Sequence, residues 1–499
     1  MYWLLSSLVV HGYVTDDLSF STILPIPKGK RLNYADSANY RGIALSSIFG
    51  KLFDLHVLSR YESFLTTSNL QFGFKRGHST SMCTMVLKEA IDYYCANGND
   101  VYCTMLDATK AFDRVEYCKL IRLLLTNRLP VIIVRFLLNI YLFQATRVAW
   151  NGFNSQCITV VNGVRQGAVL SPVLFCIYFD ELINKLEKAK YGCYIGFCFV
   201  GVLAYADDLV LLAPSANATR QMLKICDEFG GSYSVVFNAA ESAMLLCLAN
   251  RPARSYLISK PTPVFYIGGN VIPYVNEWPH LGHIISVNCD DAKDIMSRRS
   301  SLIYQINNIL CNFRKVDCST KIRLVKAYCT SFYGCELWDL SNNCIENICT
   351  AWRRGIRQAW CLPNATHSAL LPGLCETLPL RDLFHKRMLN LVYQCLNIQS
   401  PIVNFITRYS ILFGRMNSTI GRNVLSFCER YRTTIDSIVN RTYLVNNIDR
   451  AVCSELEAVS HKVDMLRELI YCREGTFNLS NSSFSHLDIE QLIIFVCTS

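Results

Sequence analysis

Three aspartates in this chain each stand at the end of an apolar run, where a lone carboxylate is costly to bury. Asp107 lies in the segment LDATKAFDRV, and the adjacent pair Asp207 and Asp208 lies in AYADDLVLL. Neighbouring carboxylates repel one another unless a cation holds them together. An isolated Asp-Asp pair is more often structural, but two neighbouring strands can bring Asp107 beside it. The three carboxylates would then form an oxygen site for two Mg²⁺ ions, which favours in-line phosphoryl transfer.

The segments that carry these aspartates must be strands if the carboxylates are to meet. Residues 101–106 are typical of a strand, and residues 197–205 and 209–213 are typical of a hairpin with the acids at its tip. A short β-branched run over residues 21–27 predicts a further strand. Apolar spacing predicts helices over residues 46–64, 79–95, 115–125, 172–188 and 452–471. From about residue 290 the pattern is mostly helical.

The composition indicates a protein with a large core and no membrane-spanning segment. Of the 499 residues, 51% are hydrophobic and 18% are charged, which excludes a small disulfide-stapled module and a disordered tail. A spanning helix needs about 20 apolar residues in a row. Arg135 and Asn139 interrupt one of the best candidates, residues 131–143. We therefore expect a soluble protein.

The cysteines and the N-terminal residues give an indication of the cellular compartment. The 24 cysteines include no Cys-x-x-Cys pair, so we expect them to be reduced core residues of an intracellular protein. The apolar stretch over residues 2–10 lacks a basic segment and an obvious cleavage site, which argues against a signal peptide. We expect the cytoplasm, the nucleus or both, and no secretion.

The net charge is compatible with a polyanionic partner. The 49 Lys and Arg exceed the 39 Asp and Glu by 10. Residues 290–387 hold 14 Lys and Arg against 9 Asp and Glu, so half of this excess lies in one helical region. A solvated helix face would have the same composition, so charge by itself leaves both interpretations open.

Seven short motifs, in order along the chain, carry a family resemblance. The sequence resembles the reverse transcriptase of non-LTR (LINE-type) retrotransposons. The motifs are ILPIPKGK (23–30), NYRGIAL (39–45), QFGFKRGHST (71–80), LDATKAFDRV (106–115), NGVRQGAVLSP (162–172), AYADD (204–208) and HLGHIIS (280–286). Two later stretches, SFYGCELWDL (331–340) and LPNATHSALL (362–371), resemble the segment that follows the polymerase core in the same elements.

The resemblance implies an α+β right-hand polymerase fold with fingers, a palm containing an antiparallel sheet, and a helical thumb. We expect a reverse transcriptase domain of fingers and palm over residues 1–288 and a helical thumb-like region over residues 289–390. A helical C-terminal region of unknown role would follow over residues 391–499.

The resemblance also assigns the metal site. Asp107, Asp207 and Asp208 match the palm carboxylates, and the main-chain carbonyl of Ala108 would complete one coordination shell. The implied cofactor is two Mg²⁺ ions, with Mn²⁺ as an alternative. One ion would lower the pKa of an attacking 3′-hydroxyl, and the other would neutralise charge on the leaving pyrophosphate.

Five residues match positions that bind the incoming nucleotide in the family. Lys28 and Arg41 would hold the triphosphate, one as a point charge and the other as a bidentate fork. Phe112 would clash with a 2′-hydroxyl and so favour dNTPs, although a core phenylalanine is the alternative. Gln166 and Gly167 would pack on the incoming base and the template.

Three further residues are implied to contact the primer and template. Arg165 would contact the template backbone, and Leu281 and Gly282 would grip the primer terminus. The basic helices after residue 290 would track the phosphates and minor groove of an RNA–DNA hybrid. The expected partners are therefore an RNA template, a DNA primer and dNTPs.

The sequence departs from the family pattern in two places. Gly42 replaces the proline that usually follows the arginine of NYR. Glu241 and Ala243 stand where the family commonly carries two lysines, one of which is a candidate proton donor to pyrophosphate. General acid catalysis is commonly worth roughly 10²- to 10⁴-fold, so the alternative is a weakened or dead nucleic-acid-binding remnant.

We also expect a truncated copy, because no endonuclease precedes the polymerase motifs. Four C-terminal residues, Cys453, His461, Cys472 and His486, fit no zinc-binding spacing. A mobile-intron polymerase or maturase is a further alternative, but residues 74–78 and the YGCELW stretch argue against it.

Overall fold

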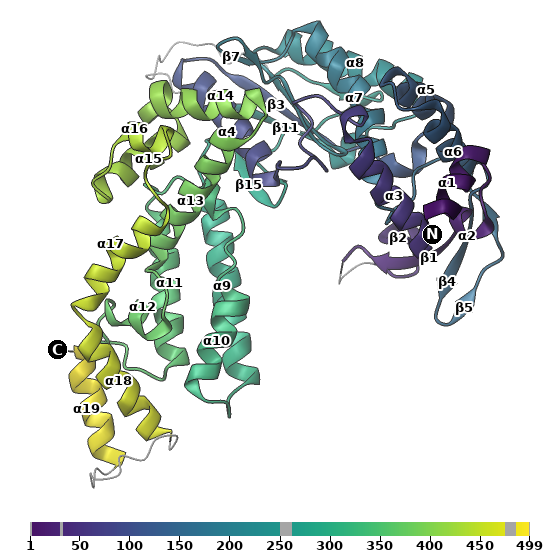
Figure 1. The fold of residues 1–499 in the computed structure, drawn as a ribbon. Helices are drawn as coiled ribbons and strands as arrows, with labels where there is room; N and C mark the ends of the chain where they lie inside the picture. The colour runs from purple at the N-terminus through teal and green to yellow at the C-terminus, as the bar shows by residue number, and fades with distance from the viewer. Residues whose placement is uncertain (1, 30–32, 250–261, 475–485, 499) are drawn as a thin grey trace. The chain divides into compact units, whose positions relative to one another are not determined.

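The computed structural model describes residues 2–29, 33–249, 262–474 and 486–498 (Figure 1). The chain forms two compact units. The first contains Met1–Cys83 and Asn97–Asn276, and the second contains Thr84–Ala96 and Glu277–Ser499. The first unit combines helices with mainly antiparallel strands and helices dominate the second, which confirms the expected α+β class.

A four-stranded antiparallel sheet forms the centre of the first unit. Its strand order is β11 (Ala243–Cys247), β3 (Val101–Leu106), β10 (Asp208–Ala213) and β9 (Val202–Tyr205). The strands are rich in Val, Leu and Met, and their residues are almost all buried. Helix α7 (Ser171–Ala189) contacts β9, and helix α8 (Ala216–Tyr233) contacts β10. The sheet therefore has a helical cover.

A second sheet has the order β2 (Tyr40–Ser46), β1 (Phe20–Pro27), β4 (Ala145–Trp150) and β5 (Phe153–Asn154), and β6 (Ile158–Thr159) pairs with β4. Strand β1 pairs antiparallel with β2 and parallel with β4. The parallel pairing brings together segments more than 100 residues apart in the chain, since Phe20 pairs with Ala145.

The remaining elements of the first unit are short or helical. They are α1 (Tyr2–His11), α2 (Asp16–Ser19), η1 (Ser37–Asn39), α3 (Ile48–Arg60), η2 (Glu62–Phe64), η3 (Ala111–Arg114), α5 (Tyr117–Thr126), α6 (Val131–Leu142), β7 (Tyr194–Ile195), β8 (Cys198–Phe199), η4 (Ala239–Glu241), β12 (Tyr266–Ile267) and β13 (Asn270–Val271). The polar residues that interrupt the apolar run of α6 have structural roles. Arg135 donates to the carbonyl of Val10 at 2.5 Å, and Asn139 donates to that of Gly12 at 2.7 Å.

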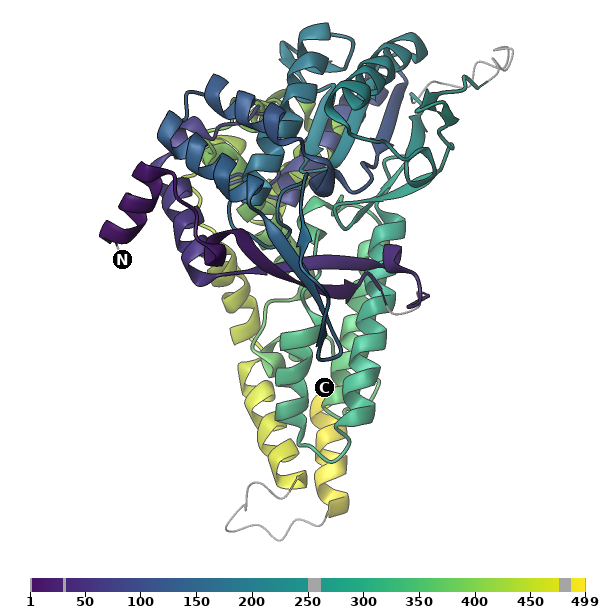
Figure 2. The same ribbon diagram turned by 90° about the vertical axis from the view of Figure 1, so that its right-hand side faces the viewer.

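The second unit is mostly helical. It contains most of α4 (Thr80–Ala96), the hairpin β14 (Glu277–His280) and β15 (His283–Ser286), and the helices α9 (Ala292–Asn312), α10 (Cys318–Cys329), η5 (Cys335–Leu337), α11 (Cys344–Ala359), α12 (Leu370–Cys375), α13 (Leu380–Asn397), α14 (Pro401–Tyr409), η6 (Ser410–Gly414), η7 (Arg415–Asn417), α15 (Thr419–Arg430), α16 (Ile435–Val439), α17 (Asn446–Glu457), α18 (Ser460–Arg473) and α19 (His486–Thr498). Both views show α9 beside α11 (Figures 1 and 2). Trp338 is fully buried in this unit, and its indole nitrogen donates to Asp294 at 2.7 Å.

Most predicted elements are present, although some bounds shift by a few residues and some elements are divided. The strand over residues 101–106 is confirmed without change, and the hairpin strand expected from residue 197 begins at residue 202 as β9. The helix expected over residues 452–471 is two helices, because the chain turns at Ala458 and Val459 between α17 and α18. Among the described residues, no helix combines the length and the apolar character that a membrane crossing requires.

Candidate active site

The three aspartates lie where β3 and β10 meet at the edge of the central sheet. Asp107 follows the last residue of β3, and Asp208 is the first residue of β10. Leu106 pairs with Leu209, so the same register continued by one residue sets Asp107 opposite Asp208. Asp207 lies in the two-residue loop that joins β9 to β10. The sheet therefore brings together the carboxylates that the sequence separates by a hundred residues.

The environment of these carboxylates opposes their ionisation. Burial raises the pKa of Asp107 to about 6, and the neighbouring charges of Glu241, Asp207 and Asp208 act in the same direction. Burial and then the charge of Asp207 raise the pKa of Asp208 to about 6. Burial also raises the pKa of Asp207, against the positive charge of Arg41. A bound cation would relieve the repulsion that these shifts report.

Among the neighbouring acidic groups, Glu241 acts most strongly on Asp107. The two carboxyl groups share a hydrogen bond. The turn that carries Glu241 is tied to the end of β3 by the backbone, because the Asp107 N–H donates to Ser242 Oγ at 3.1 Å and the Asn238 N–H donates to the Asp107 carbonyl at 3.0 Å. Where the family pattern has a cation, this site therefore has an additional carboxyl group.

The donor set suits a divalent ion, although the side chains are not gathered around one point. Carboxylate oxygens are the ligands that Mg²⁺ prefers. Within the described ranges, no three His, Cys, Asp or Glu side chains converge as a ready ligand group. The Ala108 carbonyl fits as a further ligand. At the β-bridge between Ala108 and Phe237, the hydrogen bonds are made by the flanking residues Asp107, Thr109, Val236 and Asn238. The Ala108 carbonyl takes no part in these hydrogen bonds.

Phe112 presents a half-buried ring that a second phenylalanine supports. Its ring stacks on that of Phe175 in α7, with centroids 4.3 Å apart and planes inclined by 16°. Phe175 is fully buried and fixes the position of the outer ring. The role expected of Phe112 in selecting the sugar stays a prediction.

The Gln166–Gly167 segment packs on the edge of β2. The Ala44 N–H donates to the Gln166 carbonyl at 2.6 Å, and Gln166 Nε2 donates to Asp113 at 3.5 Å. Gly167 has a φ of +108°, and a Cβ there would lie 2.8 Å from the Ala44 carbonyl oxygen. Only glycine allows this approach of the two backbones.

Lys28 and Arg41 are exposed on the same hairpin. Strand β1 ends at Pro27, and its partner strand β2 pairs Arg41 with Ile26. The Lys28 N–H donates to the Asn39 carbonyl at 2.9 Å, which holds Lys28 at the closing end of the pair. The positive charge of Arg41 acts on Asp207 and opposes the rise of its pKa that burial causes.

Comparison with known proteins identifies the fold that holds this site. A family model described as reverse transcriptase (RNA-dependent DNA polymerase) matches residues 26–271. The chain contains a reverse transcriptase domain. All of the aspartates, Phe112 and the Gln166–Gly167 segment lie inside it, and the right-hand polymerase fold expected from the sequence is confirmed.

The relatives are polymerases of non-LTR retrotransposons, as the motifs indicate. The Pol polyprotein from the type-2 retrotransposable element R2DM of Drosophila melanogaster is 25% identical over 52% of this chain and 25% of that protein. The probable RNA-directed DNA polymerase from transposon X-element of the same species is 25% identical over 61% and 34%. The polymerase from mobile element jockey of Drosophila funebris is 24% identical over 64% and 35%.

The chain spans between 25% and 35% of the length of these relatives. Among solved structures, apo telomerase from Candida Tropicalis is similar with a TM-score of 0.41 and 12% identity, over 85% of this chain and 74% of that chain. A reverse transcriptase domain implies the use of a divalent metal ion.

Arg165 of the reverse transcriptase domain is not placed as a template contact. Its guanidinium is buried and donates to the carbonyls of Leu18 and Ser19 at 2.8 and 2.7 Å. Asp54 and Tyr141 lie close enough to act electrostatically on it. The side chain ties the 162–172 motif to α2, and its expected contact with the template backbone stays a prediction.

Leu281 and Gly282 form the loop of the β14–β15 hairpin, in the second compact unit. Tyr333 donates its hydroxyl to the Leu281 carbonyl at 3.0 Å, and Arg298 donates to the Gly282 carbonyl. A Cβ at Gly282 would lie 2.8 Å from the Tyr333 ring. The hairpin is thus fixed to the helical part of its own unit, and its contact with a primer stays a prediction.

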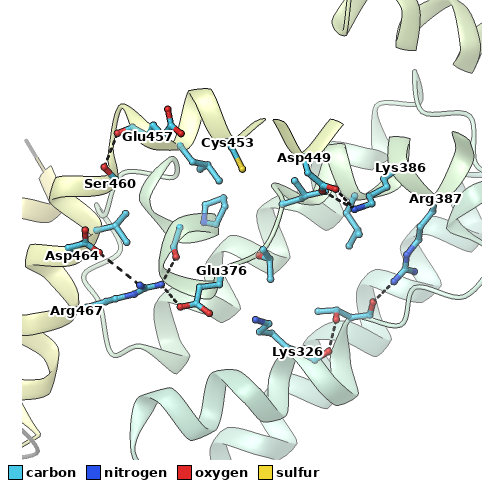
Figure 3. Close-up of a pocket in the computed structure, with 18 residues that line it drawn as sticks. Lys326, Glu376, Lys386, Arg387, Asp449, Cys453, Glu457, Ser460, Asp464 and Arg467 are labelled. Atoms are coloured by element: carbon cyan, nitrogen blue, oxygen red, sulfur yellow. Dashed lines mark hydrogen bonds and ion pairs between the residues drawn. The ribbon is translucent and has the colours of Figure 1, made fainter. Parts of the chain in front are cut away.

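A pocket of about 810 Å³ lies within the second unit, among α10, α12, α13, α17 and α18 (Figure 3). Charged side chains that line this pocket pair with one another: Lys386 pairs with Asp449 at 2.7 Å, and Arg467 pairs with Glu376 at 3.1 Å. None of the predicted site residues lines it.

The domain boundaries expected after residues 288 and 390 also stay predictions.

Two residues of the reverse transcriptase domain escaped assignment from the sequence. Phe175 lies behind Phe112, and Gln71 lies against the loop that carries Asp207. Gln71 is the first residue of the motif at residues 71–80. The motif indicated that this segment matters, but not which residue Gln71 contacts. Phe175 gave no signal, because it occurs among other apolar residues of a buried helix.

Proposed function

We propose that this chain is an RNA-directed DNA polymerase of a non-LTR retrotransposon, which adds dNTPs to a primer 3′-end and releases pyrophosphate. One observation carries the proposal. Asp107, Asp207 and Asp208 come together at the ends of adjacent antiparallel strands inside a reverse transcriptase domain. Oxygen ligands in this arrangement are what a two-metal phosphoryl transfer needs.

The metal is proposed to be Mg²⁺, with Mn²⁺ as an alternative. Asp107 and Asp207 would be the firmest ligands, and Asp208 and the Ala108 carbonyl would support them. When bound, two such ions supply activation of the 3′-hydroxyl and neutralisation of the pyrophosphate. Burial, and after it the charges of neighbouring carboxylates, raises the pKa of Asp107 and Asp208 to about 6, which supports a site that gains from a cation.

The protein's own side chains would bind and orient the nucleotide. Lys28 and Arg41 on the β1–β2 hairpin would hold the triphosphate, since their charges complement phosphate oxygens. Phe112, held by Phe175, would exclude a 2′-hydroxyl, and the Gln166–Gly167 segment would pack on the base. An RNA template and a DNA primer are the proposed partners.

A primer-extension assay tests this function. The whole chain is incubated with an RNA template, an annealed DNA primer, dNTPs and Mg²⁺, beside Asp207→Asn and Asp207→Ala. We expect extension by the wild type and a loss of at least about 10²-fold in both variants, because removing a group that stabilises transition-state charge typically costs that much. Equal binding of the hybrid by all three proteins is the control. Extension that persists in Asp207→Ala would contradict the proposal.

The second candidate is a remnant that binds nucleic acid without catalysis. The specific observation in its favour is the hydrogen bond between Glu241 and Asp107, where a proton-donating cation is expected. Wild type and Asp207→Ala that bind the hybrid equally and extend it equally poorly would support this candidate.

A further inference from the structure

Gln71 is fully buried beside the loop that carries Asp207 and Asp208. The backbone around it extends the central sheet by a single bridge, in which Gln71 lies parallel to Ala204 of β9. The Ala204 N–H donates to the Leu70 carbonyl at 2.9 Å, and the Phe72 N–H donates to the Ala204 carbonyl at 2.8 Å. These bonds fix the Gln71 backbone beside Ala204, two residues before Ala206, where the loop begins.

The side chain of Gln71 makes three hydrogen bonds, and two of them are to one residue. Its Oε1 accepts from the N–H of Ala206 and from the N–H of Gly73, each at 2.9 Å. Its Nε2 donates to the Ala206 carbonyl at 3.4 Å. The amide thus holds both backbone polar groups of the residue immediately before Asp207.

Ala206 needs such support because its backbone is unfavourable for a residue with a Cβ. Its φ is +60°, in the left-handed region that glycine adopts more readily. This conformation reverses the chain within a two-residue loop, with Tyr205 paired to Asp208. The direction of Asp207 and Asp208 therefore depends on a strained residue that Gln71 holds from the side.

Gly73 completes the fit of the two segments. A Cβ at this position would lie 2.4 Å from the Ala206 nitrogen, so the 71–73 backbone can approach the loop only because residue 73 is glycine. Cys176 of α7 also donates to the Gly73 carbonyl at 3.6 Å. The approach, the bridge and the three amide bonds are separate observations that converge on the same loop.

We propose that Gln71 is a positioning residue for the proposed polymerase site: its side-chain amide holds Ala206 in the left-handed conformation and so aims Asp207 and Asp208 at the metal ions. This inference rests on the proposed function for its catalytic meaning. Gln71 itself contacts neither substrate nor metal in this role.

The test substitutes Gln71 by Met, which has similar length and no hydrogen-bonding amide. Hydrogen exchange of the Ala206 N–H in the metal-free whole chain is the first readout, and exchange should become at least several-fold faster. Mn²⁺ binding, followed by the loss of free Mn²⁺ signal in electron paramagnetic resonance, is the second. Loss of a group that orients metal ligands typically weakens metal affinity by about 10- to 100-fold, and we expect a change in this range.

Two further variants separate positioning from general stability. Leu245→Val removes buried volume from β11 in the same sheet, and it should lower the melting temperature while leaving Ala206 exchange and Mn²⁺ affinity unchanged. Ala206→Gly in the Gln71→Met background should recover part of the Mn²⁺ affinity, since glycine adopts a positive φ without strain. The exposed N–H at residue 206 should still exchange quickly in that double variant.

The outcomes are distinct from those that test the polymerase proposal. If the wild type extends no primer but Gln71→Met shows faster exchange and weaker Mn²⁺ binding, the positioning role stands and the polymerase proposal fails. Unchanged Ala206 exchange in Gln71→Met overturns the positioning role. So does an equal loss of Mn²⁺ affinity in Leu245→Val.

Discussion

At the scale of single residues, the three carboxylates of the candidate site differ in what surrounds each of them. Asp107 shares a hydrogen bond with Glu241, Asp208 responds mainly to burial and to Asp207, and Asp207 also experiences the positive charge of Arg41. The three aspartate side chains are chemically the same, but each has different charged neighbours. Glu241 is the one that departs from the family pattern, and it can be tested without catalysis.

Glu241→Gln should change how stability depends on pH in the metal-free protein. The folded pKa of Asp107, about 6, lies above its ordinary value of 3.8, so the stability from its protonated form is full below about pH 4 and lost as pH rises through about 6. Removing the neighbouring negative charge lowers the folded pKa, and the variant should lose less stability over this range. Urea unfolding in EDTA measures it.

A matched control is Glu228→Gln, which removes a carboxylate from the exposed pair with Lys224. Its stability should follow the wild-type pH dependence. Identical pH profiles for Glu241→Gln and the wild type would show that Glu241 does not act on Asp107.

Phe112→Val should admit ribonucleotides. The smaller side chain would open space at the Phe112–Phe175 stack, where the sugar of the nucleotide is proposed to lie. Discrimination against rNTPs should fall by roughly 10-fold or more, since one extra group in a tight pocket is worth about 1–3 kcal/mol. Single-nucleotide extension with each dNTP and rNTP measures the ratio of kcat/KM. Phe179→Leu, in the next turn of α7, is the control, and equal discrimination in Phe112→Val and wild type would refute the sugar gate.

At the scale of elements, α4 is joined to the second unit by its charged face. Lys88 donates to Asp291 and to the Leu337 carbonyl, each at 2.6 Å. Glu89 accepts from Ser418 Oγ at 2.6 Å and from the Ile420 N–H at 2.9 Å, at the beginning of α15. Asp92 accepts from the N–H of Thr419 at 3.0 Å. The helix thus caps α15 and neutralises a buried carboxylate, which explains why it clusters with residues more than 200 positions later.

Lys88→Met should destabilise the protein strongly. Asp291 is buried, and the positive charge of Lys88 helps to hold its pKa well below the usual range, against burial. Removing one member of a buried pair costs about 3–5 kcal/mol, because the other charge is left uncompensated. Urea unfolding should show this loss, and Asp291→Asn in the same chain should restore part of it. Lys224→Met at the exposed pair should cost about 1 kcal/mol or less, and a similar cost for Lys88→Met would contradict the argument.

At the scale of the whole molecule, the excess of positive charge is the property that bears on nucleic acid. The chain carries a net +10, and the helical region over residues 290–387 contributes 5 of it. Some of these cations are engaged within the fold, as Arg387 is with the carbonyls of Thr330 and Phe332. Arg314 and Lys315 are exposed between α9 and α10 and suit a phosphate contact better.

Arg314→Gln with Lys315→Gln should weaken binding of an RNA–DNA hybrid and reduce its dependence on salt. Each phosphate contact contributes a slope of about 0.7 to 0.9 in a plot of log affinity against log salt, so two lost contacts should lower it by roughly 1 to 2. Fluorescence anisotropy at several salt concentrations measures this slope. Lys188→Gln with Lys190→Gln, near the end of α7, is the charge-matched control. An unchanged slope in the first double variant would place the contact elsewhere.

The sequence by itself determined the reverse transcriptase domain, the strands that end in Asp107 and Asp208, and the helical character after residue 290. These properties are local, because strand and helix periodicity and short motifs are written in consecutive residues. Even here the limits of elements shifted, as between α17 and α18, since packing decides where a helix ends.

Only the tertiary structure decided which distant residues meet. Gln71 and Ala206 are 135 positions apart, and Arg165 lies 147 positions from its acceptor Leu18. No periodicity in the sequence predicts such pairs. From the motif alone, the arginine could be an exposed residue or a buried one that holds two segments together, and Arg165 is buried. The contact of Glu241 with Asp107 belongs to the same class. Chemistry at a site depends on side chains brought together by sheet register and loop geometry, and those are properties of the folded chain.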